Sequence, residues 1–505
     1  MMLRATLAVF AALTISANVA STAEPLREPT PSTSPSPAQQ AQIDRKYGMF
    51  CHFGMNTYAE QEWTDGSFPA ETYNPPDDLE YRVDDWVLTA RDAGMRYILL
   101  TSKHHDGFCL WDSKFTDYDV GNEKVKNHTD VIAAVAKACK KYDIGLAFYY
   151  SIWDRNQKFP NAEAYKKYTL GQLEELMSNY GPICELWLDG GWVAKPDYWH
   201  VPEIYDLVKR LQPNCVVSTN WTTGAPGDPE KHMMTPDKQA AGDPIRYFPS
   251  DFRLADPYMP VTPDPKIFTH NGKEYYLPFE ATVTLSATNR WFAHPKDTQA
   301  KSIETLEKMF YIATAQDNVL VFNLPPNKDG DLVPAQKKVL FDLAKKLSIG
   351  PGKPFPKAPE GFVFPHAKGK APGWCLAGAT ADATSTWTRD AGFEAGKAID
   401  DDTGTRWAAK DKDATLEIVL KNNLAADTLT LHEYGEGGKY RINKFSVEYF
   451  DGTDWKFLLS GSSVGANLRY QFMPVQVNRL RIKVSSPSDE IPPSLWEVGL
   501  VDSKQ

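Results

Sequence analysis

The sequence predicts an α/β protein in which a (β/α)8-like barrel is followed by an all-β jelly-roll sandwich. From Tyr47 to about residue 350, short apolar runs typical of strands alternate with amphipathic segments typical of helices, as in repeated βαβ units. Beyond Cys375 the pattern changes to strand-like runs of five to seven residues separated by turns, which indicates a β-sandwich. The length of 505 residues also favours two or three domains over a single core.

The barrel elements follow from hydrophobic runs and their stop signals. Thr129 and Asp130 are typical of a helix N-cap, and Gly94 ends another amphipathic segment. Residues 222–276, rich in Pro, Gly and Asp, predict a long loop region, and long ordered loops are usually functional. Residues 48–54 are expected to form a strand that ends in a loop. The other expected strands are 97–101, 144–150, 183–188, 215–218, 277–284 and 318–323, and the expected helices are 81–93, 131–142, 162–180, 204–211, 302–315 and 335–347.

Composition shifts divide the chain into five segments. Residues 1–23 resemble a secretory signal peptide because Arg4 precedes an apolar run and then small residues. Residues 24–40 predict an extended tether rich in Pro and Ser, 41–350 the barrel, 351–372 a linker rich in Pro and Gly, and 373–505 the sandwich. The expected sandwich strands are 414–420, 428–432, 444–449, 455–459, 469–474 and 479–484.

Charge and hydropathy limit the classes of partner. The net charge of −10 provides no basic field for a nucleic acid, so we expect no nucleic-acid binding. No second long apolar segment follows the leader, so we expect no membrane insertion and a secreted or periplasmic protein. The six cysteines form no Cys-x-x-Cys pair, so the sequence gives no indication of a zinc site or a redox motif. No sequence feature indicates an oligomeric state.

Chemistry-bearing residues follow the expected strands at the ends that share one face of a barrel. His52 follows the first strand, His104 and His105 the second, Asp154 the third, and Asp189 the fourth. An isolated Asp-Gly-Gly sequence is better explained by a turn, and only the other residues at the strand ends favour a functional role for Asp189. An adjacent histidine pair is compatible with a metal site. No His-x-His or His-x-x-x-His spacing occurs, so we favour sugar hydroxyls as the partners of the histidines and expect no catalytic cofactor.

A glycosidase needs a second carboxyl across the scissile bond. Glu280 is the first candidate, because an apolar strand would raise its pKa and suit it to act as an acid. The alternative is a structural ion pair with Arg253 or Arg290. The competing acids in the loop region are Asp243, Asp251 and Asp256.

Four motifs resemble those of the glycoside hydrolase family 29 α-L-fucosidases. They are Tyr-Gly-Met-Phe-Cys-His-Phe-Gly at 47–54, Ser-Lys-His-His-Asp-Gly-Phe at 102–108, Tyr-Tyr-Ser at 149–151 and Leu-Trp-Leu-Asp-Gly at 186–190. The resemblance covers residues 45–350 and implies a retaining exo-hydrolase on a (β/α) barrel that removes fucose from an oligosaccharide or glycoconjugate. It also implies that Asp189 is the nucleophile and that His52, His104 and His105 bind the fucose hydroxyls.

The same resemblance implies the rest of the expected site. Glu280 stands near the position of the family's acid/base, although the family's Trp-Glu and Ser-Trp-Gly-Tyr-Asn runs are matched only loosely by Phe279-Glu280 and by residues 290–294. Arg253 resembles the arginine that precedes the acid/base in the family. The aromatic residues expected to line the pocket are Trp63, Phe108, Trp111, Tyr150, Trp187 and Trp291.

The C-terminal part resembles a discoidin-type or family 32 carbohydrate-binding module. The resemblance rests on Ala-Ile-Asp-Asp-Asp-Thr-Gly-Thr-Arg-Trp at 398–407 and on Leu-Trp-Glu-Val at 495–498. It implies that Asp400, Thr405 and Glu497 lie near a structural calcium, for which carboxylates and carbonyls are suitable ligands. The alternative is a domain that only packs.

Two other functions stay open at this point. One is a related exo-hydrolase, such as a galactosidase that recognises the same axial hydroxyl pattern. The other is a secreted glycan-binding protein on a hydrolase scaffold that has lost its activity. The second carboxyl distinguishes a catalyst from a binding protein, because hydrolysis requires an acid facing Asp189.

Overall fold

A computed structural model describes residues 24–501 except 232–234, 262–263, 360–361, 363–375, 377, 390, 401–404, 437–438 and 466–467. The N-terminal part is an eight-stranded parallel sheet in the order β5-β4-β3-β2-β1-β10-β9-β6. The terminal strands β5 and β6 also contact each other, so the sheet is nearly a closed barrel. Its strands are β1 Tyr47–Cys51, β2 Tyr97–Lys103, β3 Gly145–Ser151, β4 Glu185–Asp189, β5 Val216–Thr219, β6 Arg253–Leu254, β9 Phe279–Thr284 and β10 Val319–Asn323.

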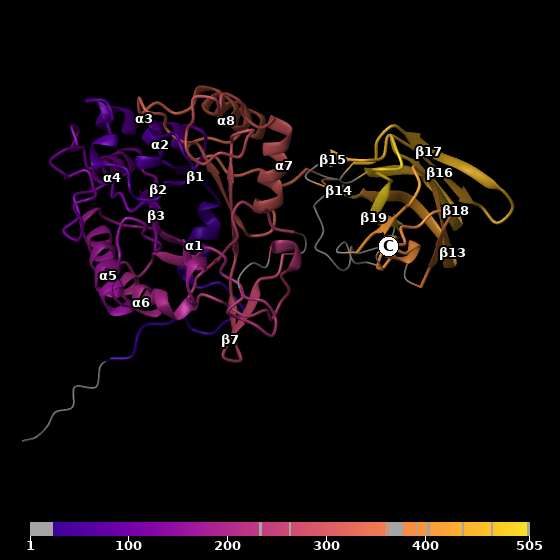
Figure 1. The fold of residues 1–505 in the computed structure, drawn as a ribbon, viewed down its shortest axis with the longest axis horizontal. Coiled ribbons are helices and arrows are strands. Elements are labelled where there is room, and N and C mark those ends of the chain that lie inside the picture. The colour runs from indigo at the N-terminus through magenta and orange to yellow at the C-terminus, as the bar shows by residue number, and fades with distance from the viewer. Residues whose placement is uncertain are drawn as a thin grey trace, which may run out of the picture.

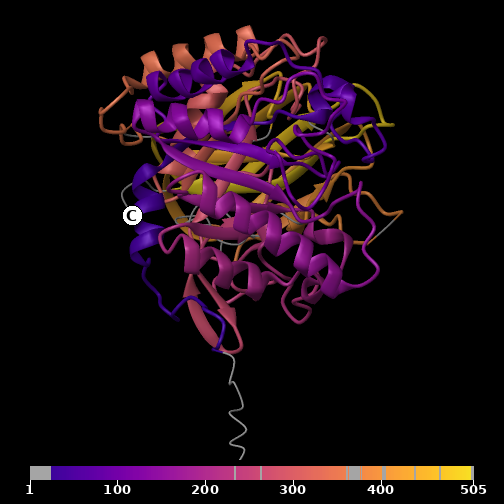
Figure 2. The same ribbon diagram turned by 90° about the vertical axis from the view of Figure 1, so that its left-hand side faces the viewer.

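Helices cover the outside of this sheet (Figures 1 and 2). Their apolar faces pack on the strands, which explains the helical spacing of apolar residues in the sequence. Asp130 is the N-cap of α4, as expected, and its carboxylate accepts a hydrogen bond from the Ala133 N–H at 2.8 Å. The helices are α2 Met55–Ala59, α3 Leu79–Asp92, α4 Val131–Tyr142, α5 Ala162–Asn179, α6 Val201–Leu211, α7 Ile303–Thr314 and α8 Pro334–Leu347.

The predicted alternation of strands and helices is confirmed, with one addition. The loop region 222–276 contains the two-residue strand β6 and the hairpin of β7 Ile267–His270 and β8 Lys273–Tyr276. Strand β6 pairs with β9 at only two positions, Arg253 with Phe279 and Leu254 with Glu280. A strand this short leaves no periodic signal in the sequence, and it supplies the eighth position of the barrel.

Side chains fill the barrel in layers along the strand direction. On β4, Glu185, Trp187 and Asp189 alternate with residues that face the helices, since successive side chains point to opposite faces. Trp187 stacks on Tyr149 of β3, with ring centroids 5.3 Å apart. Asp189 is therefore at the carboxyl end of the barrel and Glu185 at the amino end, roughly 13 Å apart at the usual strand rise.

An N-terminal helix, α1 Pro37–Arg45, closes the amino end of the barrel. Gln39 donates hydrogen bonds to the Asp251 and Tyr276 carbonyls at 2.6 Å each, and the Gln42 amide contacts the Glu185 carboxyl. The prediction of an extended tether through residue 40 is thus wrong for residues 37–40. Ser36 forms a capping box with Gln39, which begins the helix. The expected signal peptide lies outside the described residues.

The C-terminal part is an antiparallel β-sandwich with its own apolar core, and it forms a separate body in Figure 1. Two long bent strands, β13 Asp413–Glu433 and β18 Leu468–Ser485, replace the two pairs of shorter strands expected from the sequence. Register shifts within them allow each to bend without ending. The other main strands are β11 Thr380–Ala383, β12 Trp407–Ala408, β16 Lys444–Phe450, β17 Trp455–Gly461 and β19 Ser494–Val501, and a small hairpin comprises β14 Gly435–Glu436 and β15 Lys439–Tyr440.

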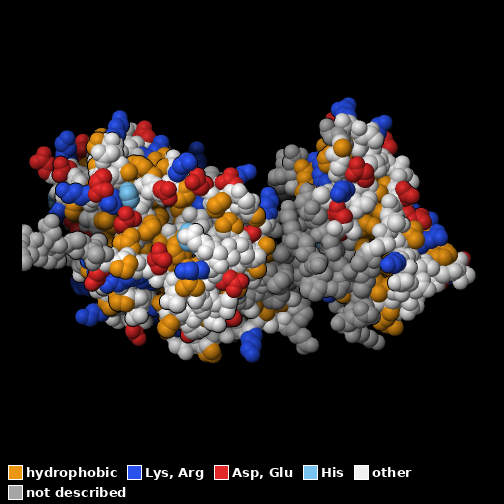
Figure 3. Space-filling view, turned by 90° about the horizontal axis from the view of Figure 1, so that it is seen from below, with side chains coloured by type: hydrophobic (Ala, Val, Ile, Leu, Met, Phe, Trp, Pro, Cys, Tyr) orange, Lys and Arg blue, Asp and Glu red, His pale blue; other side chains and the backbone are white. Residues whose placement is uncertain are grey.

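Surface charge follows the sequence expectation. Basic and acidic side chains are mixed over the face shown in Figure 3, without a continuous basic field for nucleic acid. Within the described part of the chain, no helix is long and apolar enough to cross a membrane.

Candidate active site

A pocket opens at the carboxyl end of the barrel, where the loops after most of the strands meet. Five of the predicted residues besides Asp189 and Trp187 line it, and six further residues join them. The predicted lining residues are His52, Trp63, His104, His105, Trp187, Asp189 and Trp291. The others are Phe50, Glu62, Tyr149, Trp192 and Asp256, together with Thr282 on β9.

Asp189 ends β4 and is held by hydrogen bonds on both oxygens. Its Oδ2 accepts from the Tyr149 hydroxyl at 2.8 Å, and its Oδ1 accepts from the Asn220 amide at 3.0 Å. His105 Nε2 is 3.5 Å from Oδ2, longer than a hydrogen bond. Burial raises the pKa of Asp189 to about 6, while the bonds from Tyr149 and Asn220 act in the opposite direction. The carboxylate is therefore fixed in orientation and ionised at neutral pH.

Asp256, in the segment after β6, is the acid that the structure brings next to Asp189. The same Asn220 amide nitrogen contacts Oδ1 of both carboxyls. The nearest oxygens of the two acids are therefore separated by at most two hydrogen-bond lengths, roughly 6 Å. Burial, followed by the negative charge of Asp189, raises the pKa of Asp256 to about 7. At neutral pH this carboxyl can hold a proton that Asp189 has already lost.

The histidines of the pocket are buried and neutral. Burial lowers the pKa of His52 and His105 to about 3 and that of His104 well below its usual value. His52 Nδ1 lies 2.8 Å from the Asn323 side-chain oxygen, so Nδ1 carries the proton and Nε2 is an acceptor. His104 Nδ1 instead lies 2.9 Å from the Asn56 amide nitrogen, so its Nε2 carries the proton. The pocket thus offers one imidazole acceptor and one imidazole donor to a ligand.

Glu62 and aromatic rings form the remaining wall. The Glu62 carboxylate accepts a hydrogen bond from the Trp291 N–H at 2.8 Å, and Arg290 lies 3.6 Å away. Burial raises the pKa of Glu62. Trp63, half exposed at the rim, stacks on Trp192 with ring centroids 6.2 Å apart. The wall combines flat apolar surfaces with a carboxylate, a combination that suits a polyhydroxylated ligand.

The structure contradicts the role expected for Glu280. This residue lies near the amino end of β9, where its Oε2 accepts from the Tyr97 hydroxyl at 2.8 Å and from Gln42 at 3.4 Å. It shares a hydrogen bond with Glu185, and it is 1% exposed. Glu280 is therefore at the level of Glu185, roughly 13 Å along the strands from Asp189. Burial does raise its pKa, as expected, but at the wrong end of the barrel.

Four other predicted site residues are structural and do not line the pocket. Phe108 packs on Tyr73 and Tyr118 with ring centroids 4.8 and 5.2 Å apart, and the Trp111 indole donates to Glu175 at 2.9 Å. Tyr150 faces the helices, where its hydroxyl donates to Gln172 at 2.7 Å. Arg253 is buried in an ion pair with Asp264 at 2.7 Å and Arg290 lies near Glu62, so neither arginine forms the ion pair with Glu280 that the sequence left open. In each case the side chain makes its contacts outside the pocket.

Tyr149 shows what sequence reasoning missed and why. The motif at 149–151 contains two adjacent tyrosines, and only strand parity decides which one faces the interior. Asp189 faces inward on β4 and pairs in register with Ser151 of β3, which places Ser151 and Tyr149 inward and Tyr150 outward. Glu62 had no such signal, because it lies in an irregular loop.

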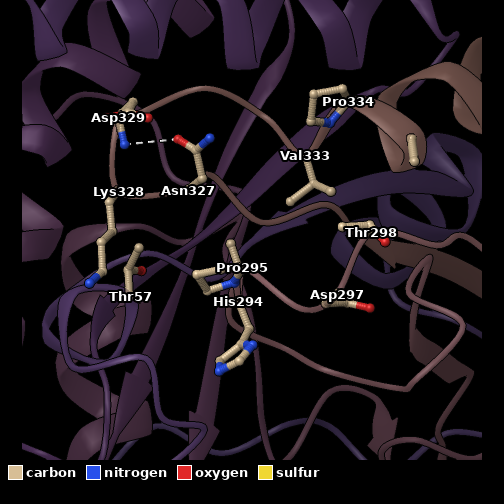
Figure 4. A pocket seen from close by; sticks show the side chains of 12 residues that line it. Thr57, His294, Pro295, Asp297, Thr298, Asn327, Lys328, Asp329, Val333 and Pro334 are labelled. Atoms are coloured by element: carbon tan, nitrogen blue, oxygen red, sulfur yellow. Dashed lines mark hydrogen bonds between the residues drawn. The ribbon is translucent and has the colours of Figure 1, made fainter.

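A larger cavity of about 610 Å³ lies beside the pocket on the same face (Figure 4). Loops after β1, β9 and β10 line it, with His294, Asp297 and Lys328 among its polar residues. The Asp297 carboxylate is already engaged by Ser286, Thr288 and Gln336 at 2.8 to 3.1 Å. Asp329 also lines this cavity, and among the described residues no side chain donates a hydrogen bond to both Asp297 and Asp329 in the way that Asn220 contacts both acids of the neighbouring pocket.

The expected calcium site of the sandwich stays a prediction. The Thr405 hydroxyl donates to the Asp400 carboxylate at 2.8 Å, and Lys397 forms an ion pair with the same carboxylate at 3.1 Å. Glu497 is buried on β19 opposite His432. Residues 401–404 of the motif lie outside the described residues. No cluster of three or more His, Cys, Asp or Glu residues suited to a metal occurs among the residues that the structure describes.

Comparisons with known proteins identify the families that the two parts of the chain resemble. An α-L-fucosidase family model matches residues 13–350, and an F5/8 type C domain model matches residues 380–498. The Arabidopsis thaliana protein named alpha-L-fucosidase 1 is 31% identical over 304 residues, which cover 59% of this chain and 57% of that protein. The Mus musculus tissue alpha-L-fucosidase is 23% identical over 346 residues, which cover 61% of this chain and 69% of that protein.

A solved structure is similar in fold. Alpha-L-fucosidase isoenzyme 1 from Paenibacillus thiaminolyticus has a TM-score of 0.50 and 18% identity, and the match covers 89% of this chain and all of that one. The chain spans little more than half the length of the Arabidopsis relative that it matches. The family model covers well over half of the present chain, including every residue of the pocket. This chain belongs to the α-L-fucosidase family and carries a C-terminal F5/8 type C domain.

Proposed function

We propose that the protein is a retaining exo-glycosidase that removes terminal α-L-fucose from oligosaccharides or glycoconjugates. In the first step the Asp189 carboxylate attacks the anomeric carbon while Asp256 gives its proton to the leaving oxygen. In the second step Asp256 takes a proton from water, which displaces Asp189 and releases fucose with its α configuration. The proposal replaces Glu280 by Asp256 as the acid/base.

The shared amide of Asn220 is the observation that carries this proposal. Retaining glycosidases hold their two carboxyls about 5 to 5.5 Å apart, whereas inverting enzymes need about 6.5 to 9.5 Å to admit a water. One nitrogen that contacts both acids supports the shorter separation. The two pKa values, about 6 for Asp189 and about 7 for Asp256, support a division into nucleophile and proton donor.

The neutral histidines support a sugar as the ligand. His52 and His104 offer opposite hydrogen-bonding roles, which suits neighbouring hydroxyls that each donate and accept. Glu62 adds an acceptor near Trp291. All the groups that this mechanism needs belong to the chain, and we propose that catalysis requires no cofactor.

Hydrolysis of a panel of aryl glycosides tests the substrate. We expect turnover of aryl α-L-fucosides and little or none of aryl β-D-galactosides, which share an axial hydroxyl. Preferred turnover of the galactoside would replace fucose by galactose, and turnover of neither would favour a glycan-binding protein. NMR of the first-formed sugar tests the stereochemistry, and an inverted product would contradict the two-step mechanism.

The location and the sandwich complete the proposal. The apolar leader sequence at 1–23 supports export, so we place the protein in the periplasm or outside the cell. We also propose a structural calcium near Asp400 in the sandwich, which the thermal midpoint of the full-length protein with and without a chelator would test. An unchanged midpoint would refute the calcium and leave the fucosidase proposal intact.

A further inference from the structure

Two aromatic residues flank the proposed proton donor. Trp221 directly follows Asn220, and Tyr258 comes two residues after Asp256. Their rings pack edge to face, with centroids 5.9 Å apart. Tyr258 is 42% exposed and Trp221 is half-buried, so the pair presents apolar ring surface to solvent. Neither ring lines the pocket that contains Asp189, so the pair forms a second surface beside Asp256.

The backbone of Trp221 is held in a strained conformation. Its φ of +61° lies in the left-handed region, which is uncommon for a large side chain. Its N–H donates to the Leu254 carbonyl at 3.1 Å and to the Asn220 side-chain oxygen at 2.9 Å. Strain of this kind persists where surrounding contacts impose it, often at functional sites. Here the hydrogen bond from the Trp221 N–H connects this residue to the Asn220 side-chain amide, which also contacts both acids.

The reaction determines where the rest of the substrate begins. The leaving oxygen must lie within hydrogen-bonding distance of Asp256, so the sugar that carries the fucose begins beside that carboxyl. A pyranose offers a flat C–H face, and exposed aromatic rings bind such surfaces while leaving the hydroxyls hydrated. Trp221 is adjacent to Asn220, which contacts Asp256, and Tyr258 is two residues from Asp256, so this aromatic pair is near the proton donor.

The geometry points to Trp221 and Tyr258 as the platform that binds the sugar unit to which the fucose is attached, a neutral hexopyranose. This inference rests on the proposed function and extends it from the fucose to the leaving group. Trp63 and Trp192, in contrast, line the fucose pocket beside His105. Platform residues bind a part of the substrate that does not react, so their effect depends on the size of the leaving group.

Two substrates separate the platform from the reaction itself. Fucosyl fluoride has no sugar as leaving group, whereas fucosyl-α-galactose and fucosyl-α-N-acetylglucosamine both have one. Of the two disaccharides, the one that the wild type hydrolyses faster is used. The measured ratio is kcat/KM for this disaccharide divided by kcat/KM for fucosyl fluoride. We expect Trp221→Ala to lower this ratio about tenfold, Tyr258→Ala to lower it less, and Trp221→Phe to restore most of it.

The controls distinguish this inference from its alternatives. Phe457→Ala removes a ring that is 66% exposed on the sandwich and should leave the ratio unchanged. An equal loss on both substrates in Trp221→Ala would overturn the platform. A selective loss on the disaccharide would overturn it too if free galactose or N-acetylglucosamine inhibited Trp221→Ala as strongly as the wild type, because the residue would then only position Asn220 and the proton donor. A selective loss in Trp192→Ala with none in Trp221→Ala would also overturn it. Wild-type activity on fucosyl fluoride tests the proposed function separately, because its absence would contradict the fucosidase itself.

Discussion

Replacing Asp256 by Ala tests the division of labour between the two acids most directly. The substitution removes the proton donor and leaves Asp189 with its bonds from Tyr149 and Asn220. A sugar alkoxide is a strongly basic leaving group that needs protonation, whereas a nitrophenolate needs little. We therefore expect the formation of the glycosyl-enzyme to slow for natural glycosides and to survive for nitrophenyl fucoside.

The structure sets the size of the effect. With a pKa of about 7, Asp256 is protonated in about nine-tenths of molecules at pH 6 and in about one-tenth at pH 8. General acid catalysis contributes typically 10² to 10⁴ in rate, or about 3 to 5 kcal/mol of activation free energy. We expect a fall in kcat/KM within that range for a disaccharide at pH 6, and less than about tenfold for nitrophenyl fucoside.

The assay measures kcat/KM, which reports the first step, and kcat, which includes the second step, for both substrates with and without azide. Without Asp256 the second step lacks its base, and azide needs no deprotonation, so azide should restore turnover of nitrophenyl fucoside. Azide attacks the intermediate from the face opposite Asp189 and should give the α-azide. In Asp189→Gly, azide would replace the nucleophile and give the β-azide instead.

Two controls keep the comparison sharp. Glu280→Gln alters the carboxyl at the amino end of the barrel and should keep the disaccharide activity of the wild type. Glu62→Gln alters a pocket carboxyl that binds Trp291, and it should slow both substrates alike. The reasoning is refuted if Asp256→Ala keeps wild-type activity on the disaccharide, or if Glu62→Gln is the variant that azide rescues with an α-azide.

Three further predictions follow from the pKa values and their causes. First, kcat/KM should rise with pH as the acid pair loses its first proton near 6 and fall as the pair loses its second proton near 7. Asp256→Ala should lose the fall at alkaline pH, and a retained fall in rate measurements from about pH 4 to about pH 9 would contradict this assignment. Second, Tyr149→Phe removes a hydrogen bond that stabilises the Asp189 carboxylate, so the acid limb of the kcat/KM profile should move to higher pH. An unchanged acid limb would mean that this hydrogen bond does not affect the reacting acid. Third, burial raises the pKa of Glu280 and of its neighbour Glu185, so the folded protein binds more protons than the unfolded chain above the usual glutamate pKa, and stability falls as pH rises. The thermal midpoint of Glu280→Gln should therefore fall less between pH 5 and pH 8 than the thermal midpoint of the wild type. An equal fall in both proteins, measured by thermal unfolding, would count against a shared proton in this pair.

Much of the barrel and its first acid could be predicted from the sequence because those features are local. Apolar runs that end at Asp189, His52 and His104 mark strands with chemistry at their carboxyl ends, and amphipathic spacing marks the helices between them. All three residues line the pocket. The change from alternating to all-β pattern likewise separates the barrel from the sandwich without any knowledge of contacts.

The tertiary structure alone decided which side chains face the pocket and at what depth. Tyr149 and Tyr150 are neighbours with the same side chain, and the closure of the barrel turns one toward Asp189 and the other toward Gln172. Glu280 has the burial expected of a catalytic acid, but strand register places it in the wrong layer of the barrel. Asp256 lies in an irregular segment with no periodic signal, and only the folded chain brings it to Asn220. A contact between loops that are distant in sequence depends on the arrangement of the whole sheet, so no local stretch of sequence could predict it.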